Sequence, residues 1–289
     1  MLSFLKRVIL FGIISWIPLL SWGNNLSEIH SAAERYYGEG SYDEAITEFK
    51  RYLYFSSTDS ARYHDIHQKL GNCYAYQNQN GQAIAEYNKA MAYADSDSAY
   101  YRSALAVVSL YIASEQFERA QQQILNLQIG VSDSTLMRKV SLYKGINELH
   151  RFNWEASHKA FRQYFTDPAG RVILDSLFHQ AGNLSLKSPA FARILSAILP
   201  GLGQIYGGDY ENGIRAFVLN GLLFYNFAYY YNRNHLVNTV LSGILIANRY
   251  IMGNREHAAG VVKDHNRQLQ SSYAQETMKG ILHVFKRVQ

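Results

Sequence analysis

The stretch KLGNCYAYQNQNGQAIAEYNKA, residues 69–90, consists of two apolar segments separated by a short polar break. Gly71 and Tyr74 share one face of a helix before the break, and Ala83 and Tyr87 share one after it, because residues three and four apart are neighbours on a helix. The break is rich in Asn, Gln and Gly, which favour turns. A small residue in each segment lets two backbones approach, so the stretch predicts a pair of packed helices.

The same pattern recurs along the chain. Ala45, Ala83, Ala120 and Ala156 are separated by 38, 37 and 36 residues. Each of the first three follows a small residue by 12 positions and a tyrosine by nine. The small residue and the tyrosine are Ala33 and Tyr36 before Ala45, Gly71 and Tyr74 before Ala83, and Val108 and Tyr111 before Ala120. In the fourth unit Gly145 lies 11 residues before Ala156, which predicts a turn one residue shorter. One helix pair cannot bury its apolar face alone, so we expect the pairs to stack into a solenoid.

Over residues 26–165 the pattern resembles the tetratricopeptide repeat family. Residues 69–90 and AAERYYGEGSYDEAITEFKRY, residues 32–52, carry the family's small and aromatic positions at its spacing. The resemblance implies a solenoid that binds protein partners in a groove lined by the first helix of each pair. The groove-facing candidates that it implies are His30, Glu34, Tyr37, Gln68, Asn72, Arg102 and Ser109. For each of them the alternative is an ordinary solvated surface residue.

After Ser188 the composition becomes more apolar. Two runs, residues 214–231 and 236–252, carry one charge each and are separated by the polar residues NRNH. Each run is near the shortest length that can span a bilayer. They predict a helical hairpin in a membrane, and the alternative is a buried pair of helices in a soluble domain. Four amides interrupt the runs, and we expect them to form hydrogen bonds across the helix pair. These are Asn220, Asn226, Asn238 and Asn248.

The glycine-rich stretch PGLGQIYGGDYENG, residues 200–213, lies between apolar segments. A dinucleotide-binding loop would need a preceding strand and a glycine at position 206, where Tyr206 stands. The stretch instead resembles the motif of small two-helix membrane domains. IMGNREHAAGVVKDHN, residues 251–266, resembles the closing element of a related domain in uncharacterised envelope proteins of Bacteroidetes-type bacteria. The motif residues are Pro200, Gly201, Gly203, Gln204, Tyr206, Gly208, Gly213, Gly253 and Asn254.

The first 23 residues have the layout of a signal peptide. Lys6 and Arg7 precede an apolar run over residues 8–20, and the small residues Ser21 and Gly23 follow it. The alternative is an uncleaved N-terminal anchor. Export would place the following domain in the periplasm of a bacterial cell envelope.

Charge and motifs argue against nucleic-acid binding and against catalysis. The net charge is +5, and residues 188–289 carry 10 basic against 5 acidic side chains without the dense clustering of a nucleic-acid site. The lone Cys73 is expected to be a small buried residue. His64 and His67 share a helix face, but no third metal ligand is apparent. We therefore predict no catalytic residue, metal or cofactor, and no enzyme activity.

Together these observations predict an all-α protein, a tetratricopeptide-like helical-hairpin solenoid followed by a helical membrane hairpin. The predicted parts are a signal peptide (1–23), a repeat domain (24–187), a membrane domain (188–267) and an amphipathic tail (268–289). The predicted function is a membrane-anchored protein–protein interaction scaffold, whose partners are a protein and membrane lipid. One alternative is an oligomeric transport or channel-like component with the repeats as assembly platform. Another is a soluble envelope enzyme with an unrecognised site.

Overall fold

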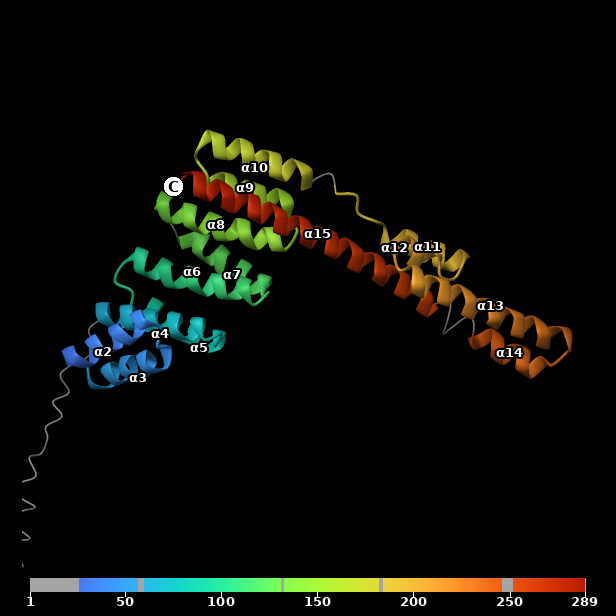
Figure 1. Cartoon of the computed structure of the whole chain (residues 1–289), viewed down its shortest axis with the longest axis horizontal. Helices are drawn as coiled ribbons and strands as arrows, with labels where there is room; N and C mark the ends of the chain where they lie inside the picture. Colours follow the sequence, from blue (N-terminus) through green and yellow to red (C-terminus); the bar gives the residue numbers. More distant parts are fainter. Residues whose placement is uncertain (1–25, 57–59, 131–132, 182–183, 246–251, 289) are drawn as a thin grey trace, which may run out of the picture. The chain divides into compact units, whose positions relative to one another are not determined.

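The protein is described by a computed structural model, and every regular element in its described residues is a helix (Figure 1). The described residues are 26–56, 60–130, 133–181, 184–245 and 252–288. The predicted signal peptide lies outside them. The all-α class is thus confirmed for the described part of the chain. The chain divides into two compact units, Met1–Asn147 and Glu148–Gln289, called the first and the second unit below.

The first unit is a succession of helices that pack on their neighbours along the chain. They are α2 (Leu26–Glu39), α3 (Tyr42–Phe55), α4 (Ser60–Tyr76), α5 (Asn80–Ala92), α6 (Asp97–Ala113) and α7 (Phe117–Gly130). The next helix, α8 (Ser134–His150), runs across the division between the units. Pairs α2–α3, α4–α5 and α6–α7 correspond to the first three predicted repeats.

The same turn joins the two helices of each pair. A residue with positive φ ends the first helix, and the backbone N–H of the following residue donates to a carbonyl five positions earlier. The positive-φ residues are Gly40, Asn78, Glu115 and, after α8, Phe152. The turn geometry therefore repeats at intervals of 38, 37 and 37 residues.

The fourth pair corrects one sequence-based prediction. The residue five positions after the positive-φ residue is a buried alanine in the first three pairs, but in the fourth it is Ser157, which is fully buried. Ala156 is not in the equivalent place, so the prediction of a shorter turn is wrong. Ser157 follows Gly145 by 12 residues, as in the other pairs. Serine can take the place of alanine here because packing at this position requires a small side chain and not alanine in particular.

Small and aromatic side chains pack together in the first unit, as the sequence predicts. A Cβ atom on Gly71 would lie 2.4 Å from the ring of Tyr87, so the ring occupies the space that the glycine leaves. Ala33, Ala45 and Cys73 are fully buried in the same core. Burial raises the pKa of the Cys73 thiol to about 11, so the thiol stays protonated at neutral pH.

The second unit is organised around one long helix, α15 (Gly253–Val288), which packs on α10, α11 and α12 (Figure 1). The other helices are α9 (Trp154–Tyr164), α10 (Pro168–Ala181), α11 (Pro189–Ile198), α12 (Leu202–Gly207), α13 (Tyr210–Asn232) and α14 (Leu236–Leu245). The α13–α14 hairpin connects to the rest of this unit through α12.

The predicted tail is the last part of α15, which runs through residues 267 and 268 without a break. Ile281 and Val284 are buried. The hydroxyl of Tyr273 donates to the carbonyl of Leu177 on α10 at 2.6 Å, and Gly280 lies against the same leucine. The apolar side of the tail thus covers a helix of its own chain, a packing surface not anticipated from the sequence.

Candidate functional site

Three of the predicted groove residues, Glu34, Tyr37 and Asn72, belong to a polar network that links α2 to α4. Lys69 forms an ion pair with Glu34, with 2.6 Å between Nζ and Oε1. The side-chain amide of Asn72 donates to the hydroxyl of Tyr37 at 2.9 Å and accepts from that of Tyr87 at 2.8 Å. The ion pair and the Asn72–Tyr37 bond each join residues 35 positions apart, which holds the first helices of successive pairs in place.

The other candidates differ in accessibility. Gln68 is buried and accepts a hydrogen bond from Ser103 on α6, so it connects two helices rather than facing a groove. Ser109 donates to a carbonyl of its own helix. His30 is partly exposed, and Arg102 on α6 is exposed. The candidates that are at least partly accessible are therefore His30, Glu34, Tyr37, Asn72, Arg102 and Ser109.

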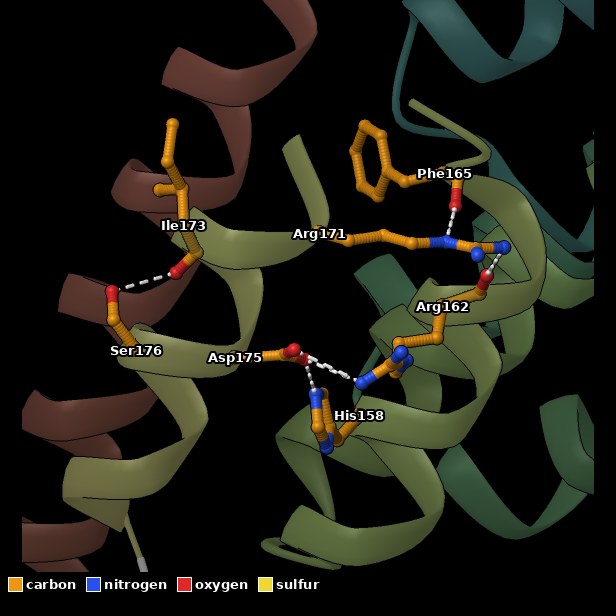
Figure 2. A network of polar contacts seen from close by, with 7 residues as sticks. All are labelled: His158, Arg162, Phe165, Arg171, Ile173, Asp175 and Ser176. Atoms are coloured by element: carbon orange, nitrogen blue, oxygen red, sulfur yellow. Dashed lines mark hydrogen bonds and ion pairs between the residues drawn. The ribbon is translucent and has the colours of Figure 1, made fainter. Parts of the chain in front are cut away.

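A second polar network, which sequence reasoning missed, joins α9 to α10 (Figure 2). Nε2 of His158 lies 2.7 Å from Oδ1 of Asp175, and Arg162 donates to both oxygens of the same carboxylate at 3.0 Å. The hydrogen bond to His158, assisted by Arg162, holds the pKa of Asp175 below its ordinary value. A cavity of about 390 Å³ lies beside the network. Its lining residues are Trp154, Glu155, His158, Asp175, Phe178 and His179.

Arg171 in the same view closes the end of α9 (Figure 2). Its guanidinium donates to the carbonyls of Phe165 at 2.8 Å and Arg162 at 3.2 Å. The last carbonyls of a helix lack partners within the helix, and a cation there also interacts favourably with the helix dipole. The α9–α10 network therefore has a structural role, because its contacts join the two helices and close the end of α9. Among the described residues, no group of three or more His, Cys, Asp or Glu side chains could hold a metal ion.

The glycine-rich motif forms the junction of α11, α12, α13 and α15. Gln204 is buried; it accepts a hydrogen bond from Ser196 on α11 at 3.1 Å and donates to the side chain of Asn254 on α15. Ser196 also accepts from the backbone N–H of Gly203 at 3.0 Å. The two segments that carry the motif, 50 residues apart, thus meet through side chains in a buried polar cluster. The hydroxyl of Tyr206 accepts a backbone hydrogen bond from Ser188.

Three glycines of the stretch allow neighbouring helices to approach closely at this junction. A Cβ atom on Gly201, whose φ is +98°, would lie 2.1 Å from the carbonyl oxygen of Gly213. A Cβ atom on Gly203 would lie 2.2 Å from the carbonyl oxygen of Ala192, and one on Gly207 would lie 2.6 Å from Val261. The motif is therefore a packing element between helices.

The α13–α14 hairpin buries three polar side chains and exposes many of its large apolar ones. The side chains of Asn220, Thr239 and Ser242 are buried. The outer surface is formed by exposed apolar residues, the reverse of the usual arrangement in a water-soluble helix pair. These include Ile214, Phe217, Val218, Leu219, Leu222, Phe224, Val237, Val240, Leu241 and Ile244.

The polar groups inside the hairpin form hydrogen bonds within their own helices. Asn220 donates to the carbonyl four residues earlier at 2.7 Å, and Thr239 and Ser242 do the same at 3.0 and 2.7 Å. The expectation of a bond across the helix pair is therefore wrong for Asn220, because the carbonyl four residues back lies within reach of its short side chain. Asn226 and Asn238 are exposed, and Asn248 lies outside the described residues.

Within the described ranges, no helix has both the length and the apolar character needed to cross a membrane.

Comparisons with known proteins find no match: no protein-family model, no curated protein and no solved structure matches the chain. The two family resemblances seen in the sequence stay predictions.

Proposed function

We propose that this protein is a membrane-anchored scaffold of a bacterial cell envelope, which binds a protein partner through its helical repeats. The α13–α14 hairpin is held in lipid, and the repeats extend into the periplasm. The observation that carries the proposal is the polarity of the hairpin, with Asn220, Thr239 and Ser242 inside and apolar side chains outside. Lipid favours this arrangement, because apolar side chains can face acyl chains while the side-chain donors of Asn220, Thr239 and Ser242 bond to carbonyls of their own helices.

The breadth of the apolar surface favours lipid over a protein groove. Phe217, Val218 and Leu219 are consecutive, and each is about half exposed. Successive residues on a helix are about 100° apart, so these three span roughly 200° of its circumference. A protein groove receives a narrower face of a helix. Near the loop end of α13, Tyr229 and Tyr231 are exposed and the guanidinium of Arg233 lies 4.8 Å from the ring of Tyr229, as expected for side chains at a membrane interface.

The repeats supply the protein-binding part of the proposal. The accessible candidates lie on successive first helices, and the contacts of Glu34 and Asn72 hold part of this surface in one arrangement. A surface that is already ordered loses less entropy on binding a partner. Anchoring the repeats to a membrane raises the effective concentration of the bound partner near other membrane components.

The anchor is tested by flotation of the full chain with lipid vesicles. We expect the unchanged chain to float, and Leu222→Glu with Val218→Glu to lower its partition into vesicles by about tenfold, because a charge in the acyl region is costly. Ile129→Glu on α7 is the matched control, since Ile129 is 87% exposed but lies outside the hairpin. An unchanged partition of the hairpin variant, with release of the native chain from cell membranes by carbonate, would contradict the anchor.

The partner surface is tested by site-specific photocrosslinking in the full chain. A photoreactive amino acid at Tyr37 or Arg102 should give one defined adduct with a protein of the envelope. The photoreactive amino acid placed at Gln82 or Asn88, which are exposed on the second helix α5, should give no adduct. Equal crosslinking from both sets of positions would rule out the first-helix surface as the binding site.

A further inference from the structure

We infer that α11 is an interfacial helix, which lies on the same membrane as the hairpin with its apolar face among the lipid headgroups and upper acyl chains. This inference rests on the proposed lipid contact of α13–α14. It extends that contact to a separate element, the 10-residue helix α11, which is not part of the hairpin.

The side chains of α11 are divided between two faces of opposite character. Ala192 and Ser196 are fully buried against α12 and α15, so the inner face consists of small side chains, one of which carries a hydroxyl. The outer face carries Phe191, Ile194 and Ile198, exposed by 47%, 54% and 74%. These three share one face because they are spaced by three and four residues. The outward direction of the large apolar groups matches the polarity of the hairpin.

The buried polar cluster fixes the orientation of α11. Ser196 is bonded to Gln204 and to the backbone of Gly203, and Arg193 forms two hydrogen bonds with Glu256 at 3.0 and 2.9 Å. Turning the apolar face of α11 inward would break these bonds and leave the buried side-chain oxygen of Gln204 without the hydrogen bond from Ser196, which is unfavourable. The exposed apolar face is therefore a stable feature of the junction.

The charges around α11 suit a phospholipid surface. Lys187 precedes the helix with its ammonium 5.8 Å from the ring centre of Tyr206, whereas Arg193 on the helix is paired with Glu256. Residues 188–267 contain 7 basic and 4 acidic side chains. A short helix with a strongly apolar face and nearby cations binds at the interface of bilayers that contain anionic lipid.

Depth-dependent fluorescence quenching tests the inference in the full chain. An environment-sensitive probe is attached to Ile198→Cys, to Leu222→Cys in the hairpin, or to Val172→Cys on α10 as an exposed control. Cys73 is fully buried, and the unsubstituted chain checks that it takes up no probe. The vesicles contain phosphatidylcholine with some phosphatidylglycerol, and lipids with nitroxides at shallow or deep positions serve as quenchers.

We expect the Ile198 probe to shift to shorter wavelength and to be quenched more by shallow than by deep nitroxides. The Leu222 probe should be quenched more by deep nitroxides, and the Val172 probe should be unaffected. An Ile198 probe that stays in water while the Leu222 probe is quenched overturns the inference and leaves the hairpin anchor standing. A Leu222 probe that stays in water overturns the anchor, whatever the Ile198 probe reports.

A pair of substitutions adds a second readout. Ile194→Asp with Ile198→Asp should lower vesicle partition by about tenfold, because two apolar side chains are lost from the interface. Both residues are exposed, so the helical circular dichroism should not change. An unchanged partition coefficient would overturn the inference.

Discussion

Gly201→Ala is expected to lower the free energy of unfolding of the second unit by about 3 kcal/mol, from the combined costs of a left-handed conformation and an overpacked site. The φ of Gly201 is +98°, which an L-residue rarely adopts. The new methyl group would also lie 2.1 Å from the carbonyl oxygen of Gly213. Because the clash is with backbone rather than with the end of a flexible side chain, relief requires α12 and α13 to move apart.

Gly208→Ala separates these two causes. Gly208 has a similar φ of +104°, but no atom lies within 4 Å of the place that a Cβ would take. We expect a loss of about 1 kcal/mol there, from backbone strain alone. Both variants would be compared by urea unfolding of the detergent-solubilised chain, followed by circular dichroism. Equal losses in the two variants would show that the close approach of Gly201 to Gly213 makes no contribution.

Gly71→Ala is expected to destabilise the first unit by about 2 kcal/mol, although alanine is the better helix former. The new methyl group would meet the ring of Tyr87 at 2.4 Å. That ring is buried, and its hydroxyl donates to Asn72 at 2.8 Å, so it cannot move aside without losing the bond.

Gly81→Ala on α5 is the matched control for Gly71→Ala. No atom lies within 4 Å of a Cβ placed on Gly81. We expect unchanged or slightly higher stability, by up to about 1 kcal/mol, because alanine restricts the unfolded chain and favours helix. The same urea unfolding experiment measures both variants. A loss at Gly81 as large as that at Gly71 would mean that the Tyr87 contact is not the cause.

The helix pairs of the repeats could be predicted from sequence because their determinants are local. The small and aromatic positions recur at helical spacing, and Gly40 and Asn78 are residue types that tolerate a left-handed turn. Ser157 does not fit a pattern of alanines, because the packing at this position selects for small volume rather than for alanine. The predicted tail was recognised as amphipathic, but the surface that it covers, α10, is about a hundred residues away in sequence and leaves no local signal.

The candidate site was only partly predictable for a similar reason. The resemblance to known repeats places His30, Glu34 and Asn72 on first helices, but whether a side chain faces a partner or the next helix depends on how the pairs stack. The contact of Gln68 with Ser103, across 35 residues, removes that glutamine from the accessible surface. His158 and Asp175 lie 17 residues apart in no recognised motif, and only the packing of α9 on α10 brings them together.

The sequence by itself determined that the last third of the chain is apolar, basic and interrupted by amides, because composition needs no coordinates. It also singled out the glycines and Gln204 of the motif. Only the tertiary structure decided what these residues do. Gln204 meets Asn254 across 50 residues, and the glycines allow backbones to touch. The tertiary structure also decided which side chains of α11 and α13 are buried, because the buried face of a helix is defined only by the helices that pack on it.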